Sequence, residues 1–115
     1  RISDFVSLHL PIMNSTKNII NFKKIKLMKK SSYLINAARG GLINESDLYQ
    51  ALEKKIISGA ALDVFSEEPP NDQELLGLPS LMVTPHIAGN AQESIEAMGQ
   101  SAINHLVSFF KNHPK

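Results

Sequence analysis

The chain has 115 residues, of which 43% are hydrophobic and 20% charged, so it can bury a core and is not expected to be disordered. Twelve Lys and Arg side chains against eleven Asp and Glu leave a net charge of +1, which gives no electrostatic basis for binding nucleic acid or an anionic membrane. The absence of cysteine excludes disulfide scaffolds, Cys-ligated zinc and thiol nucleophiles, and no apolar run approaches the ~18 residues of a membrane span, so we expect a soluble, cytoplasmic protein.

The first part of the chain alternates short apolar runs with helical periodicity. A strand is predicted over 5–10, where an apolar run ends at a proline. Beyond a polar turn, Phe22, Ile25 and Met28 recur at helical spacing and predict a short helix whose lysine-rich face is solvated. The next apolar run, 33–36, predicts the second strand. Strand, helix and strand in this order are typical of a βαβ unit.

The middle of the chain predicts a second helix and a third strand. Asn44 is a good N-cap, and Asp47 follows three positions later, so the helix is expected to begin there. The residues expected on its inner face are Leu48, Ala51 and Leu52. Gly59 marks the expected end of this helix, and 60–64 predicts a strand whose small residues suit a central position under closely packed helices.

The last part of the chain predicts a fourth strand and a long helix. One helical turn near 73–76 interrupts a loop, and 81–84 predicts the strand. The helix is expected from about 90 to 111, where Asn90 and Glu93 resemble a capping box. Its apolar residues at i+3 and i+4 steps are Ile95, Met98, Ala102, Leu106 and Phe109. Four strands, each followed by a helix or a long crossover, predict an α/β fold with a parallel sheet.

Polar side chains follow three of the predicted strands at the points where the strands end. Arg39 follows the second strand, in a loop whose two glycines let the backbone approach a ligand. Asp63 lies at the end of the third strand, with Glu67 and Glu68 beyond it, and His86 follows the fourth. Ligands of open α/β sheets bind outside the carboxyl ends of the strands. A cation, carboxylates and an imidazole are therefore expected to gather at one edge of the sheet.

Several other chemistries lack their motifs. The sequence has no HxxxH or paired His–carboxylate spacing, so no metal site is predicted. It has neither the G-x-S-x-G motif of serine hydrolases nor the glycine-rich phosphate loop of P-loop NTPases. Taken alone, each polar residue at the predicted sheet edge could serve a surface or structural role, so the functional signal lies in their convergence.

Three segments, in chain order, resemble the successive signatures of the NAD-dependent D-2-hydroxyacid dehydrogenases. They are 36–43 (NAARGGLI), 61–69 (ALDVFSEEP) and 84–89 (TPHIAG). Residues 3–11 also resemble the strand that this family places ahead of them, so the resemblance covers essentially the whole chain. The family includes 3-phosphoglycerate dehydrogenases and glyoxylate/hydroxypyruvate reductases. The resemblance implies an α/β, Rossmann-type parallel sheet, the second half of a doubly wound dinucleotide-binding domain.

The resemblance assigns a catalytic role to three residues. Arg39 corresponds to the arginine that binds the substrate carboxylate, a task that suits the planar guanidinium fork. His86 corresponds to the general acid/base that exchanges a proton with the 2-oxo or 2-hydroxy oxygen, since imidazole titrates near neutrality. Glu68 corresponds to the carboxylate that pairs with this histidine and aims it. The implied reaction is hydride transfer between NAD(H) and a small D-2-hydroxy or 2-oxo acid.

The resemblance also implies which residues contact the nicotinamide side of NAD, with NADP not excluded. These residues are Leu10, Ala37, Ala38, Arg39, Asp63, His86, Ala88 and Gly89. Asp63 corresponds to the aspartate that contacts the nicotinamide side of the cofactor, whereas the small and apolar residues would contribute backbone and van der Waals contacts. The residues that distinguish NAD from NADP belong to another part of the family's fold, so the sequence leaves that choice open.

The first glycine of the chain is Gly40, so no G-x-G-x-x-G loop precedes it. Residues 1–115 are therefore expected to form a partial NAD-binding domain, with the G-x-G-x-x-G half and the substrate domain absent from this chain and little activity in the chain alone. The family commonly dimerises through this domain, which implies a homodimer. The alternatives are a non-catalytic, NAD-sensing, corepressor-like interaction module and an inactive fragment. Which 2-hydroxy acid would be the substrate stays open.

Overall fold

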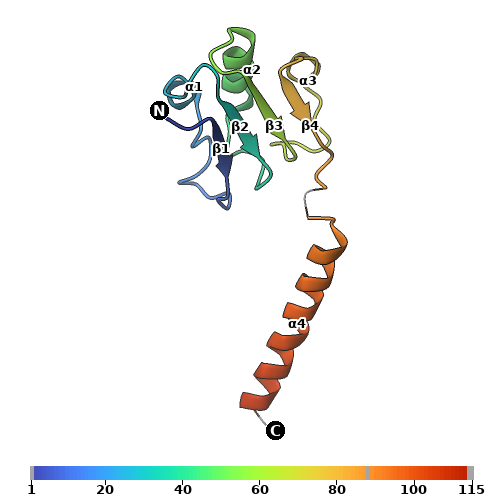
Figure 1. Cartoon of the computed structure of the whole chain (residues 1–115). Helices are drawn as coiled ribbons and strands as arrows, with labels where there is room; N and C mark the ends of the chain where they lie inside the picture. Colours follow the sequence, from blue (N-terminus) through green and yellow to red (C-terminus); the bar gives the residue numbers. More distant parts are fainter. Residues whose placement is uncertain (1, 88, 114–115) are drawn as a thin grey trace.

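The computed structural model, which describes residues 2–87 and 89–113, contains one sheet of four parallel strands (Figure 1). The strands are β1 (Phe5–Leu8), β2 (Tyr33–Asn36), β3 (Gly59–Leu62) and β4 (Leu81–Val83). They lie side by side in the order β1-β2-β3-β4, and every neighbouring pair is parallel. The predicted α/β class and parallel sheet are confirmed.

Three short helices cover one face of the sheet, and a long fourth helix follows the last strand. The helices are α1 (Phe22–Ile25), α2 (Glu45–Glu53), α3 (Gln73–Leu76) and α4 (Gln92–Asn112). Successive side chains of a strand point to opposite faces. Leu8, Leu34 and Leu62 therefore share one face, where they are buried in the same cluster as Ile25 of α1 and Leu75 of α3.

Helix α2 begins where the sequence predicts. The side chain of Asn44 accepts a hydrogen bond of 3.0 Å from the backbone N–H of Asp47, which satisfies one of the free donors of the first turn. Leu48, Ala51 and Leu52 are buried, as the apolar spacing predicts. Helix α2, which follows the loop after β2, is thus anchored on the core.

Two predicted helix boundaries are wrong. Gly59 does not end a helix but begins β3. The position requires glycine, because a Cβ there would lie 2.8 Å from the carbonyl oxygen of Ser80 and 3.1 Å from the ring of Tyr33. Asn90 does not cap α4: its backbone N–H donates to the carbonyl of Ile87, so Asn90 belongs to the preceding turn. The N-cap of α4 is Ala91, which has no side-chain acceptor.

The four strands end in register at their carboxyl ends. Leu8 pairs with Asn36, Asn36 with Leu62, and Leu62 with Val83. Three of the strands are consequently one or two residues shorter at this end than the sequence predicts, and the extra residues belong to the loops. All of these loops leave the sheet at the same edge.

The opposite face of the sheet is not covered by a helix in the described part of the chain (Figure 1). Phe5, Tyr33 and Met82 on this face are exposed, and the rings of Phe5 and Tyr33 stack with their centroids 5.5 Å apart. Parallel sheets are normally covered on both faces. This face is therefore suited to contact with further protein.

Helix α4 extends away from the sheet, and the described residues span 63 × 26 × 25 Å (Figure 1). None of its residues is buried, although its apolar side chains recur at the predicted helical spacing. Neither α4 nor any other described helix is long and apolar enough to cross a membrane. The apolar periodicity thus predicted that α4 is a helix, but it did not predict that the apolar side chains would be exposed.

Candidate functional site

The candidate site is built from loops at the carboxyl edge of the sheet. The loop after β2 carries Arg39, the loop after β3 carries Asp63 and Glu68, and the loop after β4 carries His86. Since β2, β3 and β4 are neighbours and end in register, their loops are neighbours as well. This is the edge at which open α/β sheets bind ligands.

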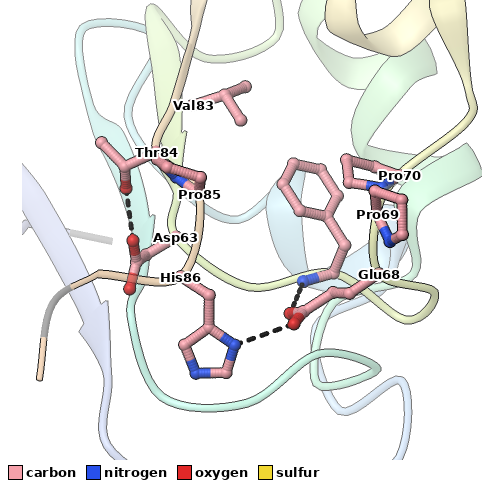
Figure 2. Close-up of a pocket in the computed structure, with 9 residues that line it drawn as sticks. Asp63, Glu68, Pro69, Pro70, Val83, Thr84, Pro85 and His86 are labelled. Carbon is pink, nitrogen blue, oxygen red and sulfur yellow. Dashed lines mark hydrogen bonds and ion pairs between the residues drawn. The ribbon is translucent and has the colours of Figure 1, made fainter.

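His86 and Glu68 lie in direct contact (Figure 2). Nδ1 of the imidazole is 2.8 Å from Oε2 of the carboxylate, and the two side chains are 51% and 38% exposed. The second ring nitrogen points away from Glu68 (Figure 2) and has no hydrogen-bond partner among the described residues. A carboxylate on Nδ1 holds the proton there, so Nε2 can accept or donate a proton on the open side.

The carboxylate of Glu68 is held by two donors. Oε2 contacts His86, and Oε1 accepts a hydrogen bond of 3.0 Å from the backbone N–H of Phe65. The hydrogen bond with His86, followed by the one from Phe65, lowers the pKa of Glu68 below its ordinary value. Glu68 is therefore ionised at neutral pH and can orient the imidazole.

Acidification is expected to remove the stabilising effect of the Glu68–His86 contact. Because the pKa of Glu68 is lower in the folded chain than its ordinary 4.5, this effect is complete above 4.5 and is lost as the pH falls through the folded-state pKa. The variant Glu68→Gln cannot ionise, so its deficit in thermal stability should be largest at neutral pH and shrink below about pH 4. Melting temperatures of both proteins between about pH 7 and about pH 3 measure this difference. A deficit independent of pH would contradict the assignment.

His86 adopts a left-handed backbone conformation that its neighbours enforce. Its φ is 54°, which is uncommon for a residue other than glycine. Oδ1 of the buried Asp63 accepts a hydrogen bond of 2.5 Å from the hydroxyl of Thr84 (Figure 2). The same oxygen accepts a second one, of 2.9 Å, from the backbone N–H of Ile87. Asp63 thus holds the chain on both sides of His86. Strained conformations of this kind persist where surrounding contacts determine them.

The loop that carries Arg39 is shaped by the buried side chain of Asn36. The amide group of Asn36 donates to the carbonyl of Arg39 at 2.9 Å and accepts from the N–H of Ala38 at 3.1 Å. The exposed guanidinium donates through Nη1 to the carbonyl of Ala38 at 2.6 Å. In the described part of the chain no hydrogen bond or ion pair joins Arg39 to Glu68 or His86. The structure therefore brings Glu68 and His86 into contact and leaves Arg39 at the same edge, with its guanidinium exposed and bound to its own loop.

The residues predicted to contact a cofactor surround this edge. Leu10, Ala37 and Gly89 are exposed, Ala38 is half-buried and Asp63 is buried. Ala88 lies outside the described residues. A hollow of about 260 Å³ is lined by Ala37, Asp63, Thr84 and Ile87 together with side chains of β2, β3 and β4.

A second hollow, of about 300 Å³, adjoins the His86–Glu68 contact (Figure 2). Its apolar walls are Phe65, Pro69, Pro70, Val83 and Pro85. Within residues 2–87 and 89–113 there is no group of three or more side chains arranged to hold a metal ion. The chemistry available at this edge is that of an imidazole, a carboxylate and a guanidinium.

Two side chains that shape the site were not singled out from the sequence. Asn36 folds the Arg39 loop, and Thr84 helps Asp63 to hold the His86 loop. One signal in the sequence points to Asn36. It is a polar residue at the end of an apolar strand, where a buried amide group needs hydrogen-bond partners. Thr84 had none, since its partner lies 21 residues away in the sequence.

Comparison with known proteins gives consistent matches along the chain. Residues 1–88 match the family model described as D-isomer specific 2-hydroxyacid dehydrogenase, NAD binding domain. The glycerate dehydrogenase of Methylorubrum extorquens is 40% identical over 116 residues, which cover 98% of this chain and 37% of that protein.

Solved structures match with similar coverage. The NAD-complexed D-isomer specific 2-hydroxyacid dehydrogenase from Lactobacillus delbrueckii ssp. bulgaricus has a TM-score of 0.81 at 35% identity, covering 98% of this chain and 38% of that one. The NADPH-dependent glyoxylate/hydroxypyruvate reductase from Sinorhizobium meliloti, in complex with NADP and malonate, has a TM-score of 0.81 at 31% identity, covering 93% and 34%. The chain spans only about a third of the length of each of these three relatives.

Proposed function

Because the chain belongs to the D-isomer specific 2-hydroxyacid dehydrogenase family, we propose that the protein transfers hydride between NAD(H) and a small 2-hydroxy or 2-oxo acid. The observation that carries this proposal is the 2.8 Å contact between Nδ1 of His86 and Glu68 at the carboxyl edge of the sheet. In this proposal, residues 1–115 supply the nicotinamide-side part of an NAD-binding domain. The G-x-G-x-x-G half and a substrate domain would complete the enzyme.

The side chains at the edge suit the two halves of the reaction. NAD(H), when bound, supplies or accepts the hydride at the 2-carbon of the acid. His86 donates a proton from Nε2 to the carbonyl oxygen during reduction and removes it from the hydroxyl during oxidation. Glu68, which is ionised, stabilises the protonated imidazole and keeps Nε2 directed outward. Arg39 binds the substrate carboxylate through two parallel N–H donors and so orients the 2-carbon.

The residues beside His86 fit a nicotinamide ring. The hollow lined by Ala37, Asp63, Thr84 and Ile87 combines small and apolar walls with a buried carboxylate. A flat aromatic ring with one polar carboxamide group matches such a surface, because its faces are apolar and its edge needs hydrogen-bond partners. NADP is the alternative cofactor of this proposal.

Turnover of 2-oxo acids by the complete protein tests the proposal. We expect NADH to be oxidised in the presence of glyoxylate or hydroxypyruvate, with formation of the corresponding 2-hydroxy acid. If NADH binds but no small 2-oxo acid is reduced by NADH or NADPH, the hydride-transfer assignment is wrong, and the NAD-sensing interaction module becomes the better description. If neither cofactor binds, both are wrong.

Replacement of Arg39 by lysine is expected to lower kcat/KM for a 2-oxo acid by about 100-fold, mainly through KM. Lysine keeps the positive charge but loses the planar fork that can hold a carboxylate with two parallel hydrogen bonds. Steady-state kinetics with glyoxylate, compared with an aldehyde that lacks the carboxylate, measure the effect. The exposed Lys24→Ala variant on α1 removes a cation elsewhere and should match the parent. An equal loss for both substrates would contradict carboxylate binding by Arg39.

The proposal includes a homodimer that acts in the cytoplasm. Support for self-association comes from two exposed apolar surfaces, the uncovered sheet face with Phe5, Tyr33 and Met82 and the apolar side of α4. Large exposed apolar surfaces are typical of contact with other protein. The substrate and the cofactor are then the small-molecule partners, and no nucleic-acid or membrane partner is proposed.

A further inference from the structure

A pair of hydrogen bonds joins two loops of the candidate site and has no part in the proposed chemistry. Glu45, the first residue of α2, accepts through Oε1 from both the backbone N–H and the hydroxyl of Ser66, each at 2.7 Å. We call these two hydrogen bonds the clasp. Since α2 directly follows the loop of Arg39, and Ser66 lies two residues before Glu68, the clasp ties the Arg39 loop to the Glu68 loop.

The same peptide unit is also held from its other side. A Cβ at Gly40 would lie 1.8 Å from the carbonyl oxygen of Phe65, so the backbone of the Arg39 loop packs directly on this carbonyl. The carbonyl of Phe65 and the N–H of Ser66 belong to one planar peptide. Gly40 contacts its oxygen end and Glu45 binds its nitrogen end. The orientation of this peptide is therefore determined by the segment that runs from the Arg39 loop into the first turn of α2.

The peptide on the N-terminal side, between Val64 and Phe65, carries the contacts on to the imidazole. The N–H of Phe65 donates to Oε1 of Glu68 at 3.0 Å, and Oε2 of the same carboxylate contacts His86 at 2.8 Å. A rotation of the backbone at Phe65 and Ser66 would move the first donor and turn the carboxylate away from the ring. The hydrogen bond from Phe65 is also one of the causes that lower the pKa of Glu68.

We propose that Glu45 and Ser66 are positioning residues, which hold the Glu68–His86 pair in place relative to the Arg39 loop. This role rests on the proposed function, because it concerns the same catalytic pair. The effect passes through the backbone of the Glu68 loop and needs no contact of Glu45 with substrate or cofactor. Misplacement of a catalytic group by ~1 Å can cost up to about 100-fold in rate, so a clasp of this kind can matter for turnover.

A purely structural role for Glu45 is the competing explanation, and α2 offers a matched control. Asp47, in the same helical turn, accepts a hydrogen bond of 3.0 Å from the backbone N–H of Phe22 and so ties α2 to the start of α1. This contact also joins a carboxylate of the first turn to a distant backbone donor. It does not touch the loops of Glu68 or His86. Loss of either carboxylate removes a similar structural contact, but only the loss of Glu45 should disturb the catalytic pair.

The test compares Glu45→Ala, Glu45→Gln, Ser66→Ala and Asp47→Ala. An NMR titration of the Glu68 carboxyl carbon in the full chain is the first readout, and kcat and KM of the complete enzyme with a 2-oxo acid are the second. We expect Glu45→Ala to raise the pKa of Glu68 toward its ordinary 4.5 and to lower kcat about 10-fold with little change in KM.

The other variants should rank by the hydrogen bonds they retain. Glu45→Gln keeps a carbonyl acceptor for the N–H of Ser66 and should restore most of the parental titration and kcat. Ser66→Ala loses only the hydroxyl donor and should be intermediate. Asp47→Ala should lower the melting temperature and leave both the Glu68 titration and kcat unchanged.

Two outcomes would overturn the proposal. One is that Glu45→Ala lowers the melting temperature as Asp47→Ala does but leaves the Glu68 titration at the parental position. The other applies if Glu45→Ala does not fold. It is a titration of Glu68 at the parental position in both Glu45→Gln and Ser66→Ala. Failure of the proposed function is distinguishable from these two outcomes. The Glu68 titrations of the parent and the variants can be compared even if the parent has no turnover.

Discussion

Replacing His86 by alanine is expected to lower kcat/KM for reduction of a 2-oxo acid by about 10³-fold while NADH binding stays close to parental. The reason is that His86 is the proton donor of the proposed reaction: Glu68 holds its Nδ1, and its second ring nitrogen points away from that carboxylate. Without the imidazole, the negative charge that develops on the substrate oxygen receives no proton from the enzyme. Steady-state kinetics and NADH titration by fluorescence separate the chemical loss from any loss of binding.

The exposed His105 on α4 provides the control for this experiment. His105→Ala removes an imidazole far from the Glu68 loop in the sequence and should leave kcat/KM unchanged. The double variant His86→Ala/Glu68→Gln should be little slower than His86→Ala, since Glu68 acts through the imidazole that is already missing. A parental rate for His86→Ala would show that proton transfer has been assigned to the wrong residue.

Replacing Gly40 by alanine is expected to lower the free energy of unfolding by at least about 3 kcal/mol, or to prevent folding. A Cβ at this position would lie 1.8 Å from the carbonyl oxygen, 2.3 Å from the carbonyl carbon of Phe65, and 2.9 Å from the nitrogen of Ser66. All three are backbone atoms, which cannot rotate aside as a flexible side chain can. The clasp from Glu45 holds the same peptide from the other side, so the clash cannot be relieved without breaking hydrogen bonds.

Gly99 in α4 is the matched control for Gly40. A Cβ at Gly99 would meet no atom within 4 Å, and alanine is favoured over glycine inside a helix by up to about 1 kcal/mol. Gly99→Ala should therefore equal or exceed the stability of the parent, as measured by urea denaturation. Equal stability of Gly40→Ala and the parent would mean that the Arg39 and Glu68 loops do not pack as the structure has them.

Local patterns in the sequence were sufficient for much of the fold. The N-cap at Asn44 and the apolar positions of α2 were predicted correctly, because a cap and a periodic apolar stripe are signals within a few residues. The single turn at Gln73–Leu76 was also predicted. The parallel direction of the strands followed from the alternation of strands and crossovers. Family membership, predicted from three linked motifs, is confirmed by the match over residues 1–88.

The sequence also predicted that Arg39, Glu68 and His86 would lie at one edge, since loops after parallel strands leave the sheet on the same side. The roles of these residues in catalysis stay predictions, which the kinetic experiments address. What the sequence by itself determined is thus the helices, the strands and the edge to which each polar side chain belongs. These features depend on residue type and on spacing along a short stretch of chain.

Only the tertiary structure decided how that edge is assembled. The contacts of Asp63 with Thr84 and Ile87, and of Glu45 with Ser66, join residues 21 or 24 positions apart. Whether such groups meet depends on the register of neighbouring strands and on the packing of backbone against backbone. The prediction that Gly59 ends a helix was wrong for the same reason. Glycine is required at this position by Ser80 and Tyr33, which no local pattern connects to it. Propensity acts along the chain, whereas the geometry of a site depends on which segments lie side by side.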